Sequence, residues 1–285
     1  MSPKDAWDVL GGTDLKDLEE ARLQAHYAVQ WAARVARAYV EAQPDDSHTS
    51  LDWDREHQAL RTQPLSGGQA LGLRLADLNL LWIDGENVGS KLPLDGIADA
   101  EAGAWVAELV KGADYETARL SEPLPYELPP HDVATGGKYA VGVNQGAFTE
   151  LGAWYDSADS ALEAVVKALG GLEPGPSPVR CWPHHFDIAT LIALEEGDAE
   201  EARSIGVGLS PGDETYAEPY YYVTPWPYPD AGKLPKLPPS GRWHTEGYVG
   251  AIATASRIGE LGSKRVAVMD FLQSSIARSR ELLGR

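Results

Sequence analysis

Two short stretches of this sequence place a histidine two residues before a carboxylate, a spacing that suits metal binding or proton transfer. His185 and Asp187 lie in CWPHHFDIATLI, and His244 and Glu246 lie in RWHTEGYVG. Residues two apart on a β-strand project from the same face, so each dyad would present an imidazole and a carboxylate together. If the two strands are neighbours, the four side chains form a ligand set for Zn, Mn or Fe(II), or a site for proton transfer.

This cluster leads to a first hypothesis, a small-molecule enzyme that is either metal-assisted or metal-free. A bound divalent ion would lower the pKa of a coordinated water and supply a nucleophile at neutral pH. His185 and His244 would be ligands or bases, and Asp187 and Glu246 would be ligands or orienting acids. The alternative is a structural network in which hydrogen bonds satisfy each histidine. Because the neighbours of His185 and Asp187 are apolar, we predict that both are largely buried and oriented towards His244.

A second group of residues, between the two dyads, favours a binding function. The turn Pro211-Gly212-Asp213 delivers two glutamates to the start of a strand rich in Tyr and Trp. Such rings have rigid faces and polar tips, which suit a ligand pocket or an oligomer interface. The second hypothesis is therefore a non-catalytic module for a small molecule or a partner, with core packing as the alternative. The candidate ligand-binding residues are Glu214, Glu218, Tyr220, Tyr222 and Trp226.

The scaffold that must position these residues is predicted to be α+β, with mainly antiparallel sheets and helices at both chain ends. Residues 14–42 and 263–283 carry apolar side chains at helical spacing. Residues 49–65 and 71–84 alternate as strands around the Ser66-Gly67-Gly68 turn, which predicts a hairpin. Strands bounded by helices, without regular βαβ alternation, are typical of the α+β class.

Three further segments complete the predicted organisation. Helices are expected over 100–113 and 157–169, each followed or ended by glycine, and strands are expected throughout 179–254. The Pro- and Gly-rich segment 121–152, between the helices expected over 100–113 and 157–169, is interpreted as a connection between two similar lobes, or as a loop on one compact unit. The predicted parts are 1–120, 121–152 and 153–285.

Composition limits the classes of partner. The 285 residues include 43 acidic and 24 basic side chains, for a net charge of −19. Such a surface repels phosphate backbones and anionic lipid, so we expect neither nucleic-acid nor membrane binding. Cys181 is the single cysteine, which excludes an intrachain disulfide. The start of the chain lacks a secretory pattern, and no apolar run reaches the roughly 20 residues of a membrane span, which predicts a cytoplasmic protein.

Three segments carry a resemblance to other sequences: HHFDIATL, SIGVGLSPGDETYAEPYYYVTPWPYP and WHTEGYVGA. They resemble an uncharacterised bacterial family of hypothetical proteins. They are more distantly similar to a bacterial domain-of-unknown-function family that has a His-x-Phe-Asp segment, a Gly-Asp turn and a Pro-aromatic-Tyr strand. The resemblance is strongest over residues 182–250, and it implies a common fold without implying a reaction. The positions that it emphasises are His185, Asp187, Glu214, Glu218, His244 and Glu246.

Overall fold

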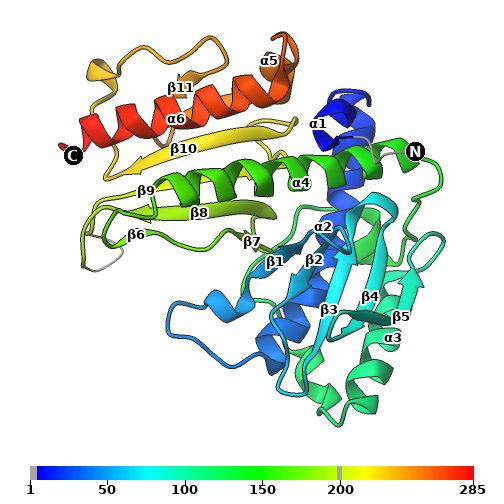
Figure 1. Cartoon of the computed structure of the whole chain (residues 1–285). Coiled ribbons are helices and arrows are strands. Elements are labelled where there is room, and N and C mark those ends of the chain that lie inside the picture. The colour runs from blue at the N-terminus through cyan, green and yellow to red at the C-terminus, as the bar shows by residue number, and fades with distance from the viewer. Residues whose placement is uncertain (1–4, 198–200) are drawn as a thin grey trace. The chain divides into compact units, whose positions relative to one another are not determined.

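The computed structural model describes residues 5–197 and 201–285 and confirms an α+β fold with antiparallel strands and helices at both ends (Figure 1). The chain divides into two compact units. Unit 1 combines the N-terminal segment up to Gly11 with Ser157–Arg180 and Asp187–Arg285. Unit 2 combines Gly12–Asp156 with Cys181–Phe186.

Unit 2 is organised around the long helix α2 (Leu15–Tyr39). The side chain of Asp14 caps its first turn by accepting a hydrogen bond from the Lys16 amide at 2.9 Å. One face of α2 is buried and packs against β2 and β3. The predicted helix over 14–42 is thus confirmed, and it ends three residues earlier than expected.

The strands of unit 2 follow the order β7-β1-β2-β3-β4-β5, and each described pair is antiparallel. The predicted turn at 66–68 is confirmed, because β2 and β3 flank it. Each predicted strand segment is in fact two strands, since residues 55–58 and Leu75–Asp77 turn the chain back within them. The strands are β1 (Leu51–Asp54), β2 (Ala59–Thr62), β3 (Gln69–Arg74), β4 (Asn79–Asp84), β5 (Asn87–Pro93) and β7 (Arg180–Trp182).

The helix α4 (Gln145–Ala168) begins twelve residues before the predicted start at 157, and the boundary between the units falls within it. Phe148, Leu151 and Tyr155 recur at helical spacing and are fully buried. Their packing overrides the low helix propensity of the glycines in this segment. The remaining elements of unit 2 are α3 (Asp99–Gly112), as predicted, and the short 3₁₀ helices η1 (Ser47–Thr49), η2 (Leu75–Asp77), η3 (Thr117–Ser121) and η4 (Asp132–Thr135).

Unit 1 contains an antiparallel sheet with the order β11-β12-β10-β9-β8, and β6 pairs with β8. The C-terminal helix α6 (Lys264–Leu282) begins after the Ser263 cap and confirms the helix predicted over 263–283. The other elements are β6 (Gly175–Pro176), β8 (Asp187–Ala193), β9 (Ser204–Ser210), β10 (Tyr220–Trp226), β11 (Arg242–His244), β12 (Gly250–Thr254), α1 (Ala6–Val9), α5 (Ala255–Gly259) and η5 (Ala231–Lys233).

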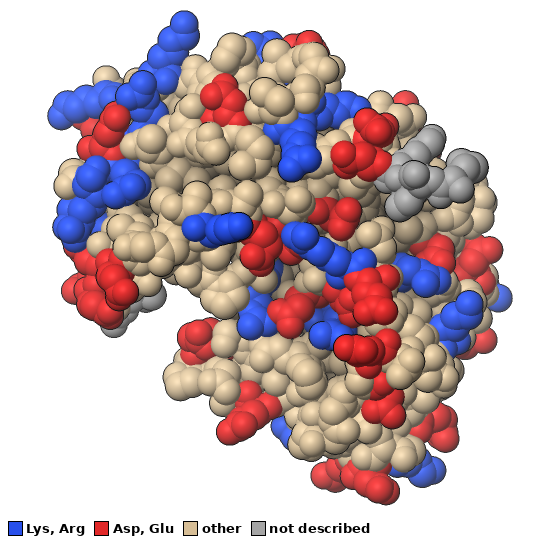
Figure 2. Space-filling view, in the orientation of Figure 1, with Lys and Arg blue, Asp and Glu red and all other residues tan. Residues whose placement is uncertain are grey.

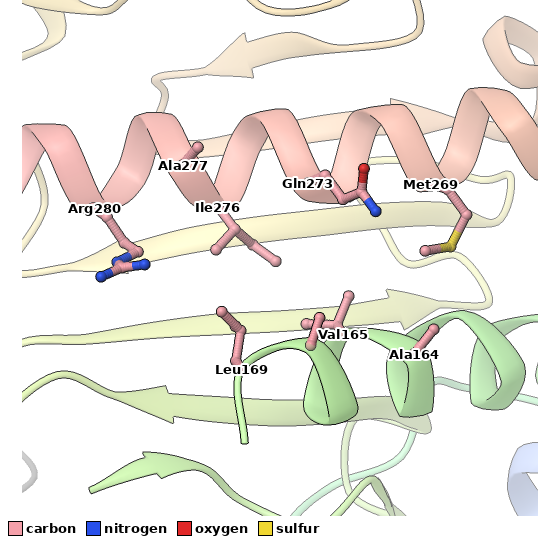
Figure 3. A pocket seen from close by; sticks show the side chains of 9 residues that line it. Ala164, Val165, Leu169, Met269, Gln273, Ile276, Ala277 and Arg280 are labelled. Carbon is pink, nitrogen blue, oxygen red and sulfur yellow. The ribbon is translucent and has the colours of Figure 1, made fainter. Parts of the chain in front are cut away.

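One face of this sheet is apolar, and α6 packs on it through contacts with β9, β10 and β12. Between α6 and the second part of α4 lies a small apolar groove of about 170 Å³, where Val165 and Leu169 face Ile276 (Figure 3). The residues of the apolar face are all fully buried: Ile188, Ile205, Val207, Leu209, Tyr221, Val223, Ala251 and Ala253.

The distribution of charge and the character of the helices can be described for the residues that the structure covers. On the face seen in Figure 2, acidic and basic side chains are intermingled and do not form one extended basic surface. Within residues 5–197 and 201–285, no helix combines the length and the apolar character that crossing a bilayer requires.

Candidate functional site

The strand order separates the two predicted dyads. Asp187 begins β8 and His244 ends β11, and three strands lie between them in the sheet of unit 1. At 4.7–4.9 Å between neighbouring strands, β8 and β11 are roughly 19 Å apart. The predicted pairing of these strands is therefore wrong. Across the described parts of the chain, no group of three or more His, Cys, Asp and Glu side chains could hold a metal ion.

His185 lies on a turn and not on the predicted strand. Residues 183–186, here called the His turn, precede β8. The amides of His185 and Phe186 both donate to the Trp182 carbonyl, at 3.2 and 2.7 Å, and Phe186 adopts a left-handed φ of +55°. The turn directs Phe186 inwards and leaves His184 and His185 exposed. The prediction that His185 is buried is wrong, because the turn buries the apolar neighbour Phe186 while His185 itself is exposed to solvent.

Buried polar side chains of unit 2 hold the His turn by its carbonyl groups. His26 Nε2 and Gln30 Nε2 both donate to the Pro183 carbonyl, at 2.9 and 3.0 Å. The Tyr155 hydroxyl donates to the Phe186 carbonyl at 2.5 Å. The His26 ring also stacks on Phe186, with centroids 5.1 Å apart and planes 7° from parallel. Burial lowers the pKa of His26 to about 4, so it supports the turn as a neutral imidazole.

In unit 1, the partner of Asp187 is a phenol. The Tyr222 hydroxyl on β10 donates to the Asp187 carboxylate at 2.5 Å, across the intervening strand β9. The Tyr222 ring crosses β9 at Gly208, where an added Cβ would lie 2.5 Å from the phenol oxygen. Burial first, and then the charge of Asp187, raise the pKa of Tyr222 well above its ordinary value. Tyr222 therefore stays a protonated donor at neutral pH.

A second set of hydrogen bonds fixes His244 on the same face of the sheet. The Tyr220 hydroxyl donates to Asp213 at 2.5 Å, and the Tyr216 hydroxyl lies 2.8 Å from His244 Nδ1. The Nε2 atom of His244 lies 2.6 Å from the backbone carbonyl of Glu246. Because a carbonyl only accepts, a neutral His244 carries its proton on Nε2 and accepts from Tyr216. Glu246 thus contributes its backbone to this contact, and it lies beyond the end of β11.

The aromatic rings on this side of the sheet form a continuous chain. Successive ring centroids are between 4.3 and 6.5 Å apart, and the contacts range from stacked to edge-on. Three of the predicted ligand-binding residues and one predicted dyad histidine thus lie in one connected surface, here called the aromatic face. Its members, in order of contact, are Tyr222, Tyr220, Tyr216, His244, Tyr248, Tyr228 and Trp226.

A cavity of about 360 Å³ lies beside the aromatic face, at the end of β12. Ile252 and Thr254 line it, and they are the cross-strand partners of Tyr222 and Tyr220. Cross-strand partners project from the same face of a sheet, so the cavity and the tyrosines share one side.

Charged side chains of both signs surround this cavity. The Arg242 guanidinium lines it and lies 5.2 Å from the centre of the Tyr216 ring. Glu218 also lines it and accepts hydrogen bonds from the amide and hydroxyl of Ser256, at 2.5 and 2.8 Å. Glu214 is exposed, and it is not among the residues that line the cavity.

Sequence reasoning treated Asp213 only as a turn residue and did not single out Tyr216, Gly208 or Arg242, although the structure connects all four to this region. The alternation of Gly206 and Gly208 within an apolar strand is a signal for close approach by a neighbouring group.

Comparisons with known proteins give no relative: no family model, no curated protein and no solved structure matches this chain.

Proposed function

We propose that this protein binds a small polar organic molecule in the cavity beside the aromatic face of unit 1. The main support is that the cavity, on the same side of the sheet as the aromatic face, is lined by polar groups that are already positioned: Arg242 against the Tyr216 ring and Glu218 by its bonds to Ser256. Ligand sites typically have volumes of roughly 300–1,000 Å³ and a few oriented polar groups among apolar walls. A side chain that is already held by hydrogen bonds, as Glu218 is by Ser256, loses little entropy on binding, so this part of the site is preorganised.

The charges around the cavity point to the class of ligand. The lining contains two arginines and two glutamates, Arg242, Arg257, Glu218 and Glu260. We therefore infer a ligand without net charge, either neutral or zwitterionic, whose own donors and acceptors pair with this lining.

A binding role fits this face better than catalysis. The carboxylates of Asp187 and Asp213 each accept a short hydrogen bond from a tyrosine, so they are already engaged. The two phenols have pKa values raised by burial and by these carboxylates, which makes them poor bases at neutral pH.

A thermal-shift screen of neutral, zwitterionic and anionic metabolites tests this function, because a ligand raises the melting temperature by mass action. We expect hits among neutral or zwitterionic compounds. In calorimetric titrations with the strongest hit, Arg242→Ala should weaken binding at least about tenfold, as loss of a charge-assisted contact does.

The matched control is Arg265→Ala, which removes the same charge from an exposed position on α6. It should bind the hit like the wild type. Equal binding by Arg242→Ala and the wild type, or hits confined to anions, would contradict the proposed site.

A further inference from the structure

Unit 2 contains a second and larger cavity, of about 550 Å³, which the proposed function does not use. Helix α2, the segments 42–49 and 122–126, and the His turn with the preceding Trp182 line it. Its aromatic wall consists of Trp182, Tyr126 and His184, with ring centroids 5.7 and 6.2 Å apart around His184. A planar ligand would find apolar ring surface here.

His48 lines this cavity and is 7% exposed. Its Nδ1 accepts a hydrogen bond from the Gln43 backbone amide at 3.1 Å, so a neutral His48 carries its proton on Nε2. Among the residues that the structure describes, no hydrogen-bond partner of Nε2 is present. Nε2 is not one of the described buried atoms that lack a hydrogen-bond partner, so it is accessible from the cavity, where an acceptor atom of a ligand can take the place of water.

Arg37 places a positive charge at the same cavity. Its neighbour Arg34 is engaged by the carbonyls of Leu120 and Glu122, at 3.1 and 2.6 Å. Arg37, by contrast, has no ion pair within the described residues. Burial raises the pKa of Tyr126 to about 12, and the positive charges of Arg34 and Arg37 oppose this rise. The charge of Arg37 therefore lies close enough to act on Tyr126, which lines the cavity.

Other titratable groups of the lining do not add a buried charge. Asp46 and Glu122 also line the cavity and are exposed, as Arg37 is, so water solvates all three charges. Partial desolvation of the exposed His184 ring first, and then the neighbouring His185, lower the pKa of His184, which keeps its imidazole neutral at pH 7. The groups of this cavity that can donate hydrogen bonds to a ligand thus include the Arg37 guanidinium and the Nε2–H of His48.

We propose that this cavity binds a small planar organic acid. The carboxylate of the ligand would accept hydrogen bonds from Arg37 and from His48 Nε2, and its planar body would lie against Trp182 and Tyr126. Arginine and an N–H donor suit a carboxylate because charge-assisted hydrogen bonds are the stronger ones. The rigid His turn keeps the aromatic wall in place. This site lies in unit 2 and does not depend on the site proposed for unit 1.

The test uses the full chain and two matched probes, indole-3-acetate and indole-3-acetamide. The amide keeps the ring and the shape and removes the negative charge. By calorimetric titration at pH 7, we expect the acid to bind at least about tenfold more tightly than the amide, as one charge-assisted contact implies.

Two variants locate the binding. Arg37→Gln removes the cation, and His48→Asn removes the Nε2 donor while its amide oxygen can still accept from Gln43. Each should weaken binding of the acid at least about tenfold. Lys91→Gln, an exposed position on β5, removes one positive charge elsewhere in unit 2 and should change nothing.

Three results would overturn the proposal: no binding of the acid at millimolar concentration, equal binding of acid and amide, or wild-type affinity in Arg37→Gln. Arg37 is exposed, so we expect Arg37→Gln to fold. Its affinity for the acid tests the proposal even if His48→Asn does not fold.

Discussion

Replacing Gly208 by alanine is expected to lower the free energy of unfolding by about 1–3 kcal/mol, as overpacking of a filled site does. The added Cβ would lie 2.5 Å from the Tyr222 hydroxyl oxygen and 2.7 Å from the Ile188 carbonyl oxygen. The Tyr222 ring must therefore move away and lose its bond to Asp187, and the Ile188 carbonyl, which belongs to the backbone of β8, must shift as well. Urea unfolding measures the loss, and a phenol that titrates closer to its ordinary pKa would report the release of Tyr222.

Gly206→Ala is the matched control, because this glycine lies two residues earlier on the same face of β9. An added Cβ there would meet its nearest atoms, the Thr224 carbonyl oxygen and Tyr222 Cε2, at 3.9 and 4.0 Å, an ordinary contact distance. The control should change the free energy of unfolding by less than about 0.5 kcal/mol. Equal losses in the two variants would show that crowding of Tyr222 is not the cause.

Acid is expected to destabilise the protein through His26. Burial lowers the pKa of His26 from 6.5 to about 4 in the folded state. Between these values the unfolded chain binds a proton that the folded chain excludes, so stability is complete above pH 6.5 and falls as the pH drops towards 4. The shift corresponds to about 3 kcal/mol at the lower end of this window.

His26→Gln isolates this contribution. The glutamine amide does not titrate, and it can donate to the Pro183 carbonyl in place of the imidazole. Urea unfolding of both proteins across this pH window should show that the wild type loses about 3 kcal/mol more than the variant. The same dependence on pH in both proteins would mean that His26 titrates normally in the folded state.

The helices α2, α3 and α6 and the first hairpin could be predicted because local residues determine them. Asp14 and Ser263 cap α2 and α6 through their side chains, and the glycines at 67 and 68 turn the chain between β2 and β3. These contacts join residues close in sequence, so they are visible in a short window of the chain.

The His turn could not be predicted, because distant residues determine it. His26 bonds to a carbonyl 157 residues away, and it is this contact, with the stacking on Phe186, that holds residues 183–186 as a turn. The apolar residues around the histidines indicated a strand, but they are buried by turning inwards. Tertiary contacts commonly override such local preferences.

The candidate site was predictable in part. The two-residue period of β10 correctly places Tyr220, Tyr222 and Trp226 on one face. The predicted proximity of His244 and Asp187 was wrong because it depended on the order of the strands. The strands β12, β10 and β9 lie between β11, which carries His244, and β8, which carries Asp187. No local pattern encodes the order of strands in an antiparallel sheet.

Binding beside the aromatic face is tested most directly by NMR on the full chain with isotope-labelled tyrosine rings, titrated with the strongest hit of the thermal-shift screen. The prediction is that the signals of Tyr216, Tyr220 and Tyr222 shift saturably, with the Kd found by calorimetry, while those of Tyr27 and Tyr39 in unit 2 stay unchanged. If the unit 1 tyrosines do not respond and signals from unit 2 follow the same Kd, the ligand binds elsewhere and the proposed site is wrong.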